Sequence, residues 1–329
     1  MNKIYVIGGG GFLGTCLIKK LKINDNSEVF CGDLKKSKIT QKNIIINVEK
    51  PETFDQISYA DTIINLAAVH RDDIKPKTKY DDVNVQGAKN ICNLARDIGT
   101  KNIIFTSSVA IYGFGPPNTD ERGDPNYFDD YGRTKFLAEN IYKEWYQEDP
   151  SNRNLTIIRP TVIFGKGNRG NVYNLLNQVA KKRFVMIGNG KNIKSMAYVE
   201  NVVAFIDFCI KKNKGINIYN YVDKPDFDMN ELVSVIRKKL FGKDNVGIRL
   251  PAFFGYFIGY FADLLSYIFR ISLPVSSIRI KKFMGTTQFD SSAREAGFSA
   301  PFSLKDALEE TITYEFIDDN SDKQTFDTE

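Results

Sequence analysis

The chain has 329 residues, of which 42% are hydrophobic and 26% charged, and its formal net charge is +5. This balance is ordinary for a globular protein, and the scattered lysine pairs argue against nucleic acid as a partner. Four widely spaced cysteines and a single histidine argue against a metal site and against a Ser-His-Asp triad. No signal-peptide pattern precedes the first predicted strand, so we expect a cytoplasmic protein.

The first half of the chain alternates predicted strands with predicted helices, as a parallel sheet requires. Strands are expected at 3–7, 28–32, 44–47, 62–66, 102–107 and 156–159, and helices at 14–21, 80–98 and 131–148. A later apolar run, 216–222, predicts another strand. The fold class is therefore α/β, a Rossmann doubly wound parallel sheet with a smaller C-terminal substrate domain.

The expected domain boundaries follow from a change in pattern after Arg159, where loops rich in glycine and asparagine begin. Residues 1–165, completed by 195–222, are expected to bind a dinucleotide. Residues 166–194 and 223–317 are expected to form the substrate domain over the carboxyl edge of the sheet. The polar residues 318–329 are expected to form a flexible tail.

A glycine-rich turn joins the first predicted strand to the first predicted helix. Gly8, Gly11 and Gly14 leave room for the turn and let backbone N–H groups approach a pyrophosphate at the helix N-terminus. The next strand ends at Asp33, whose carboxylate can accept hydrogen bonds from the ribose of an adenosine. This order predicts NAD as cofactor, and the neighbouring Lys35 leaves NADP as an alternative.

A tyrosine and a lysine, Tyr131 and Lys135, share one face of the predicted helix 131–148. A nearby ammonium and a nicotinamide cation would both favour the phenolate of Tyr131, whose pKa is ordinarily near about 10. Hydroxyl side chains lie at the end of the strand that precedes this helix, at Thr106, Ser107 and Ser108. These groups together predict proton transfer to and from a sugar oxygen.

Taken together, these motifs resemble those of extended short-chain dehydrogenases/reductases, in the nucleotide-sugar epimerase/dehydratase family. The similarity covers nearly the whole chain and is carried by residues 8–14, 65–68, 83–85, 106–113, 131–135 and 159–160. The resemblance implies Ser108, Tyr131 and Lys135 as the catalytic set. It implies cofactor contacts at Gly8, Gly11, Phe12, Leu13, Gly14, Asp33, Leu34, Ala67, Asn84, Ser107, Tyr131, Lys135 and Pro160.

On the substrate side the resemblance is looser. Lys194 stands where the family pattern has an arginine that clamps a nucleotide diphosphate, and Arg279 is a second candidate for that contact. Asn171 and Ser108 are further candidates for substrate binding. His70 follows the fourth predicted strand, near the expected substrate entrance, and we assign it no role.

Val109 and Ala110 follow Ser108 at the point where family dehydratases carry an acidic pair, so the resemblance disfavours 4,6-dehydration. It leaves a UDP-sugar 4-epimerase for bacterial surface polysaccharide synthesis, acting through a 4-keto intermediate, as the first hypothesis. The alternative is an NAD(P)H-dependent reductase of a UDP-4-keto-6-deoxy-N-acetylhexosamine. A non-catalytic dinucleotide-binding protein is the third. The family also implies a homodimer built through the helices 80–98 and 131–148.

Residues 252–273 are rich in aromatic and aliphatic side chains and include Asp263 and Arg270. Charges near the middle of a membrane span are costly, so we expect no integral span here. A helix packed in a pocket wall or a subunit interface is the favoured interpretation, and contact with the inner membrane surface is the alternative.

Overall fold

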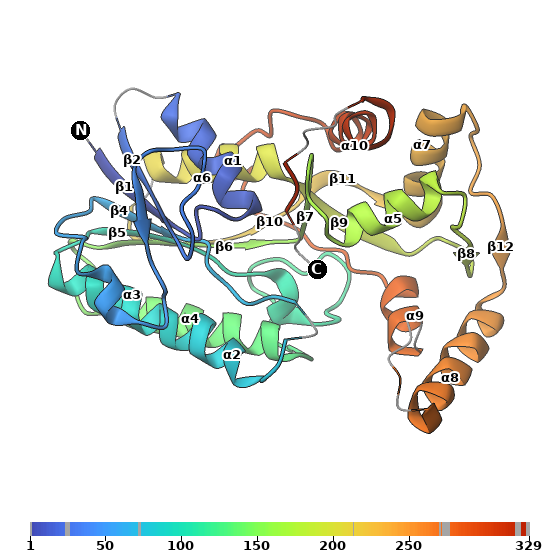
Figure 1. The fold of residues 1–329 in the computed structure, drawn as a ribbon, viewed down its shortest axis with the longest axis horizontal. Helices are drawn as coiled ribbons and strands as arrows, with labels where there is room; N and C mark the ends of the chain where they lie inside the picture. The colour runs from blue at the N-terminus through green and yellow to red at the C-terminus, as the bar shows by residue number, and fades with distance from the viewer. Residues whose placement is uncertain are drawn as a thin grey trace.

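The computed structural model describes residues 2–23, 27–71, 74–212, 214–269, 271, 277–319 and 324–326. A seven-stranded parallel sheet forms its centre, with strand order β10-β6-β5-β4-β1-β2-β3 (Figure 1). Its strands are β1 (Asn2–Ile7), β2 (Ser27–Asp33), β3 (Asn43–Ile45), β4 (Thr62–Asn65), β5 (Asn102–Thr106), β6 (Asn154–Pro160) and β10 (Ile216–Tyr221). All seven were expected from the sequence, and the order confirms the doubly wound Rossmann fold.

Helices cover both faces of this sheet (Figure 1). They are α1 (Phe12–Lys22) and α6 (Val199–Lys212) on one face, and α3 (Gly87–Asp97) and α4 (Asp130–Gln147) on the other. The strand period of two explains the layers: Ile4 and Val6 of β1 pack in the core beneath α1 and α6, and Tyr5 and Ile7 pack in the core beneath α3 and α4. Short helical turns complete this half: η1 (Pro51–Phe54), α2 (Thr78–Tyr80), η2 (Asp81–Gln86) and η3 (Val109–Tyr112).

The second part of the chain adds two small sheets and five helices to the described structure. Strands β7 (Val162–Phe164), β9 (Ile193–Tyr198) and β11 (Asp223–Asp228) form one sheet, and β8 (Met186–Ile187) pairs with β12 (Arg249–Leu250). The helices are α5 (Asn171–Ala180), α7 (Met229–Phe241), α8 (Ala252–Phe269), α9 (Ser277–Met284) and α10 (Leu304–Ile312), followed by the turn η4 (Thr313–Ile317).

The domain boundaries differ from the prediction at the junction. We expected residues up to 165, and 195–222, to belong to the dinucleotide-binding part. The structure instead pairs β7 with β9 in the small sheet, so both strands belong to the second part. Strand β10 and helix α6 do complete the large sheet and its cover, as expected. The difference arises because β7 is only two residues beyond β6, and the chain turns out of the large sheet there.

Residues 324–326 are held against the body of the protein, within the segment 318–329 where we expected a flexible tail. Backbone hydrogen bonds join Phe326 to Gly167 and Arg169, at 2.9 Å each. The Phe326 ring packs on the Phe12 ring at the start of α1, with centroids 5.6 Å apart. The prediction is wrong for residues 324–326, because a single aromatic side chain finds an apolar partner that is remote in the sequence.

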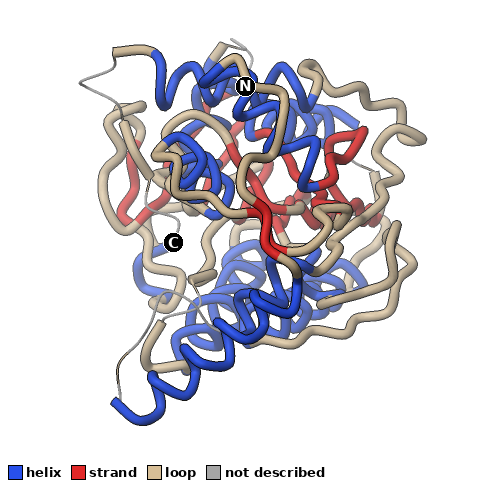
Figure 2. The backbone as a smooth tube through the Cα atoms, turned by 90° about the vertical axis from the view of Figure 1, so that its right-hand side faces the viewer, coloured by secondary structure: helices blue, strands red, loops and turns tan. Residues whose placement is uncertain are grey.

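Helix α8 projects from the body at one corner of the molecule (Figures 1 and 2). Of the described helices, it is the one with the length and composition of a membrane span, and only 17% of it is buried. It therefore does not pack in a pocket wall, which was part of the favoured interpretation of this segment. The burial pattern excludes a pocket wall within one chain, and the other half of that interpretation, a subunit interface, stays a prediction.

Candidate active site

Gly8 and Gly14 make the turn between β1 and α1 possible. Gly8 has a φ of +80°, a conformation that side chains rarely adopt, and a Cβ there would lie 2.7 Å from the backbone N of Ala67. A Cβ on Gly14 would lie 2.4 Å from the carbonyl oxygen of Gly8. Both clashes are with backbone, which cannot move aside. The turn is therefore closed to any residue except glycine at these two positions.

No described side chain caps the N-terminus of α1 with a hydrogen bond. Helix α1 begins at Phe12, and its N-cap residue Gly11 has no side chain to accept a hydrogen bond from the first turn. The N–H groups of Phe12 and Leu13 lie in that turn, and helix N-terminal N–H groups and the helix dipole favour a phosphate. This end of the helix fits the pyrophosphate of a dinucleotide.

Asp33 lies where the sequence predicted it, at the end of β2 beside the glycine turn. Its Oδ2 accepts a hydrogen bond from the N–H of Gly10 at 2.8 Å, and its Oδ1 accepts one from Leu34 at 2.7 Å. Two hydrogen bonds fix the carboxylate and leave it further lone pairs, since each carboxylate oxygen accepts two. The cradle and the acid together fit NAD, with Asp33 placed for the adenosine ribose.

Helix α4 presents the tyrosine and the lysine. Asp129 caps the helix by accepting the N–H of Gly132 at 2.8 Å. One turn in, the Lys135 ammonium lies 6.0 Å from the Tyr131 ring centroid and donates to the carbonyl of Thr106 at 2.7 Å. The Ser108 side chain lies close enough to Tyr131 to lower the pKa of its phenol, and its oxygen accepts the N–H of Ala110 at 3.1 Å. The structure thus brings together the three residues that the sequence predicted as the catalytic set.

Burial controls the protonation of this centre. Burial raises the pKa of Tyr131 to about 12, and the side chain of Ser108 lowers it in part. Burial also lowers the pKa of Lys135 to about 7, against the opposing charge of Glu139. We expected the lysine to bring the tyrosine toward working pH. Here the effect of burial is the larger one, and the positive charge of an oxidised nicotinamide would oppose it.

Other predicted cofactor positions line the same edge of the sheet. The Ser107 hydroxyl, at the end of β5, is buried without a hydrogen-bond partner, which suits a residue that contacts a ligand. Pro160 ends β6, and the N–H of Ala67 is held by Asn65 at 3.0 Å. Asn84 bonds the backbone of Val69 through both its oxygen and its amide, so it holds this loop in place. Its contact with the cofactor stays a prediction.

The substrate-side predictions are only partly located. The half-buried Lys194 ammonium donates to the carbonyls of Lys282 and Gly285, at 3.0 and 2.6 Å, and its partial burial lowers its pKa to about 8. It therefore ties α9 to β9, and its contact with a diphosphate stays a prediction. Asn171 is exposed at the start of α5. The side chain of Arg279 lies outside the described residues.

Sequence reasoning missed a buried ionic network behind the centre. The guanidinium of Arg159 donates to both carboxylate oxygens of Glu139, at 2.8 and 2.6 Å, and to the Tyr112 hydroxyl at 2.6 Å. An arginine inside a buried strand was the signal, since a buried charge needs a partner. His70, which we left without a role, lies edge-on to Tyr131 with ring centroids 6.5 Å apart.

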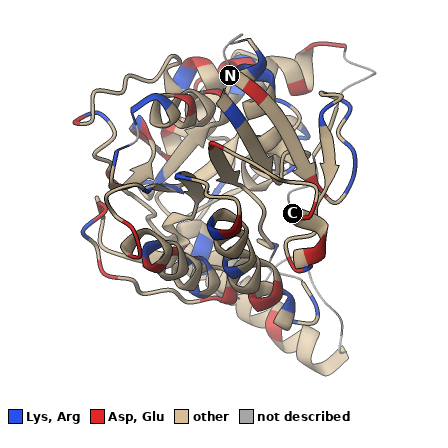
Figure 3. Ribbon diagram, turned by 90° about the vertical axis from the view of Figure 1, so that its left-hand side faces the viewer, with Lys and Arg blue, Asp and Glu red and all other residues tan. Residues whose placement is uncertain are grey.

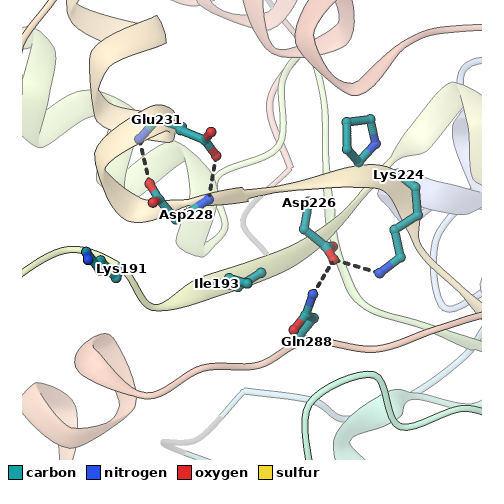
Figure 4. A pocket seen from close by; sticks show the side chains of 8 residues that line it. Lys191, Ile193, Lys224, Asp226, Asp228, Glu231 and Gln288 are labelled. Atoms are coloured by element: carbon teal, nitrogen blue, oxygen red, sulfur yellow. Dashed lines mark hydrogen bonds and ion pairs between the residues drawn. The ribbon is translucent and has the colours of Figure 1, made fainter.

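A surface hollow of about 610 Å³ lies between β9 and β11, away from these residues (Figure 4). Several of its side chains hold the surrounding elements together: Lys224 pairs with Asp226 at 2.6 Å, and Asp228 and Glu231 form the capping box of α7, each accepting a hydrogen bond from the other's backbone N–H. Because these contacts join β11 to the start of α7, we assign the hollow a structural role. Across the described ranges, 2–23 through 324–326, no cluster of metal-ligating side chains is present.

A family model described as the NAD dependent epimerase/dehydratase family matches residues 4–221, which contain the glycine turn, Asp33 and the catalytic set. The chain belongs to that family. It is an NAD-dependent epimerase, as curated relatives also indicate. A 4-epimerase of Escherichia coli O157:H7, N-acetyl-alpha-D-glucosaminyl-diphospho-ditrans,octacis-undecaprenol 4-epimerase, is 45% identical over 100% of this chain and 99% of its own length.

More distant similarities agree on the fold of this epimerase. UDP-glucose 4-epimerase of Vibrio cholerae is 26% identical and covers 94% of each chain. The solved structure of UDP-N-acetylglucosamine 4-epimerase from Bacillus cereus superimposes with a TM-score of 0.74, at 17% identity, over 95% of this chain and 98% of that one. The resemblance recognised in the sequence is confirmed at the level of family, fold and cofactor.

Proposed function

We propose that this epimerase inverts C4 of an N-acetylhexosamine that is joined through a diphosphate to a polyprenyl lipid. The proposal rests on the 45% identity, over the full length of both chains, to an enzyme named for such a substrate. It narrows the sugar epimerase expected from the sequence, keeps the diphosphate of a UDP-sugar and replaces the uridine with a polyprenyl lipid. The UDP-sugar 4-epimerase remains the second candidate, since the Vibrio cholerae relative is named for a UDP-sugar.

The catalytic set can carry the proton transfers of this reaction. Tyr131 as the phenolate takes the proton of the C4 hydroxyl, and as the phenol it returns the proton to the same oxygen after the inversion. One side chain is therefore both base and acid. Ser108, which lies beside Tyr131, is placed to hold that oxygen and pass the proton. NAD, held by the glycine turn and Asp33, would supply the chemistry that no side chain can: it would accept a hydride from C4 and return it to the opposite face of the 4-keto sugar.

Lys135 has a positioning role in this scheme. Its ammonium is anchored to the carbonyl of Thr106 at 2.7 Å and is 2% exposed, so it cannot swing away from Tyr131. In its charged form it stabilises the phenolate by Coulomb attraction. The residues after Ser108, Val109 and Ala110, offer no acid to expel a hydroxyl from C6. Epimerisation without dehydration is the chemistry that this set supports.

The test offers three substrates to the purified protein with NAD. These are N-acetylglucosaminyl-diphospho-undecaprenol in phospholipid vesicles, UDP-N-acetylglucosamine, and a UDP-4-keto-6-deoxy-N-acetylhexosamine with NADH. Sugars are released by mild acid and the two C4 epimers are separated by chromatography. We expect N-acetylgalactosamine from the lipid-linked substrate, at a rate at least about 100-fold above that from the UDP-sugar.

The alternatives have distinct outcomes. Faster conversion of UDP-N-acetylglucosamine would replace the lipid-linked substrate with the UDP-sugar. Consumption of NADH with the 4-keto sugar, and no epimerisation of either other substrate, would make the protein a reductase. Inactivity on all three substrates, in the wild type and in Tyr131→Phe alike, would support a non-catalytic role.

A further inference from the structure

Helix α8 presents large apolar side chains to its surroundings along its whole length. Tyr267 is 84% exposed and Phe257 is 68% exposed, and Phe253, Tyr260, Phe261 and Leu264 are exposed between 53% and 65%. Monomeric soluble proteins rarely expose a continuous apolar patch of this kind without using it for binding. Figure 3, coloured by charge, shows the projecting helix with little charge along it.

The opposite side of α8 carries small residues and faces the protein. Gly255 lies against Ile187, where an added Cβ would be 2.4 Å from Cγ2, and Gly259 lies against Ser277, where an added Cβ would be 2.9 Å from Cα. Ala262 is also buried. The helix therefore turns its small side chains inward and its large ones outward. This is the reverse of an amphipathic helix that packs on a soluble core.

The width of the exposed face decides what can cover it. On a helical projection with about 100° per residue, the exposed apolar side chains of α8 span an arc of about 200°. Tyr267 lies at one edge of this arc and Phe269 at the other. A helix from a second copy would cover a stripe of about 100°. A surrounding layer of acyl chains covers all of it. Tyrosines among the phenylalanines suit the depth where acyl chains meet headgroups.

Helix α9 follows α8 in the chain and begins beside the middle of α8. Asp263, in the middle of α8, accepts the N–H of Ser277 at 3.1 Å, so α9 begins level with the middle of α8. The one acidic side chain of α8 is thus directed at the N-terminus of α9, where a negative charge is favoured. Helix α9 carries the exposed Lys281, which suits an anionic headgroup region, whereas the Lys282 ammonium lies over the Phe128 ring at 4.8 Å. The two helices contact each other and form a hairpin.

The hairpin is connected to the catalytic centre. At the end of α9, the carbonyls of Lys282 and Gly285 accept hydrogen bonds from Lys194, and Thr287 pairs with Ser195 at 2.9 Å. Two residues further on, the Phe289 ring packs on Tyr112, which belongs to the turn η3 that Ser108 caps. A short continuous path of contacts thus joins the exposed helix to the substrate side of the centre.

We propose that the α8–α9 hairpin is a one-sided membrane anchor, which embeds the exposed face of α8 among the acyl chains of a phospholipid bilayer. The anchor holds the catalytic centre at the bilayer surface. There the sugar diphosphate of a polyprenyl-linked substrate reaches Ser108 and Tyr131 while its tail stays in the membrane; this last step rests on the proposed function.

A fluorescence experiment tests the contact itself. The single native tryptophan, Trp145, is fully buried, so a tryptophan at position 257 reports separately on the face of α8. The full-length Phe257→Trp protein is mixed with phosphatidylethanolamine–phosphatidylglycerol vesicles whose acyl chains are brominated or not. We expect bromine to reduce its emission at least twofold. The matched variant Ile23→Trp, 76% exposed in the wild type on the Rossmann half, should not change. Equal quenching of both variants, or of neither, would overturn the anchor.

Flotation separates the bilayer from a second copy as the partner of α8. Wild type and Ile23→Glu should float with the vesicles, and the double variant Phe257→Glu/Tyr267→Glu should stay at the bottom of the gradient. A double variant that floats like the wild type contradicts the proposal. So does a wild type that stays at the bottom as a dimer which the double substitution splits into monomers.

Activity separates the anchor from the proposed substrate. With the substrate in vesicles, we expect the double variant to be at least about tenfold slower than the wild type. With a water-soluble substrate that carries only two isoprene units, we expect both proteins to have the same rate. A wild type that binds vesicles but epimerises only UDP-N-acetylglucosamine refutes the proposed function and keeps the anchor. A wild type that epimerises the lipid-linked sugar without binding vesicles refutes the anchor and keeps the function.

Discussion

Lys135 illustrates what burial does to a side chain at the centre. An ammonium with 2% exposure has lost nearly all of its hydration, and the pKa of the group falls from 10.5 to about 7. Between pH 7 and pH 10.5 the lysine is therefore protonated in the unfolded chain and mostly neutral in the folded chain. Below pH 7 its burial lowers the free energy of unfolding by the full amount, and this penalty disappears as the pH rises toward 10.5.

The Lys135→Met variant should reveal that cost. From the two pKa values, the wild type should gain about 3 kcal/mol relative to the variant between about pH 6.5 and about pH 9.5. The comparison requires urea unfolding of both proteins, without cofactor, across this pH range. A difference in unfolding free energy that stays constant with pH would mean that the folded lysine titrates normally.

Tyr131→Phe removes only the hydroxyl that transfers the proton. We expect epimerisation to fall at least about 100-fold, in the range that a general acid–base group contributes. Bound NAD should be retained, since the ring stays. Tyr127→Phe, which removes a phenol from a partly exposed position, is the control and should keep wild-type activity. Activity within a few-fold of wild type would place the proton transfer on another residue.

Among the elements, the turn from β1 to α1 makes the sharpest demand on sequence. A Cβ on Gly14 would meet the backbone of Gly8 at 2.4 Å and of Gly9 at 2.6 Å, whereas a Cβ on Gly11 has its nearest atom at 3.4 Å. Gly14→Ala should therefore lose at least about 2 kcal/mol of stability along with bound NAD. Gly11→Ala should keep its melting temperature, so any loss of NAD there reports a contact with the cofactor. Thermal unfolding and absorbance of co-purified NAD measure both; equal melting temperatures for the two variants would contradict this account.

Helix α4 is fixed to the sheet by the ion pair of Arg159 with Glu139, whose side chains are 5% and 0% exposed. Removing one partner of a buried pair leaves an uncompensated charge, so Glu139→Gln should destabilise by about 3–5 kcal/mol. Lys238→Gln breaks the exposed pair with Asp244 and should cost less than about 1 kcal/mol. Urea unfolding of both variants tests this contrast. Similar decreases in the free energy of unfolding would mean that water reaches the ion pair of Arg159 with Glu139.

On the scale of the whole molecule, the last described residues return to the start of the chain. Phe326 packs on Phe12 in the first turn of α1, beside the glycine turn. Phe326→Ala should destabilise by about 1–2 kcal/mol and weaken NAD retention. Ile317→Ala, also near the C-terminus and 52% exposed, should do neither. Calorimetry and cofactor titration measure the two effects, and an unchanged melting temperature would show that the tail contributes nothing.

Two predictions concern assembly and place in the cell. The homodimer through α3 and α4 and the cytoplasmic location both stay predictions, and a membrane anchor on α8 is compatible with each. Helices α3 and α4 pack side by side on the face of the sheet opposite α1 and α6, whereas α8 lies at a remote corner (Figure 1).

Local patterns made much of the fold predictable. Alternating side chains in β1, the glycines before α1 and the four-residue spacing of Tyr131 and Lys135 depend on backbone geometry within one or two elements. The order of these motifs along the chain was enough to predict the parallel sheet and NAD, and the family resemblance implied Ser108 as the third member of the catalytic set. Each of these features is specified by neighbours in sequence, so no distant contact was needed to find them.

Distant contacts decided the rest. The composition of α8 is the same whether the helix lies in a pocket wall, a subunit interface or a membrane, and only its packing shows that the large side chains face outward. The partners of Lys194 lie 88 and 91 residues away, and Phe326 finds Phe12 from the other end of the chain. The sequence by itself determined the family, the fold and the cofactor, and the roles of Ser108, Tyr131 and Lys135 stay predictions. The tertiary structure alone decided which surfaces stay uncovered, because burial is a property of packing and not of any single segment.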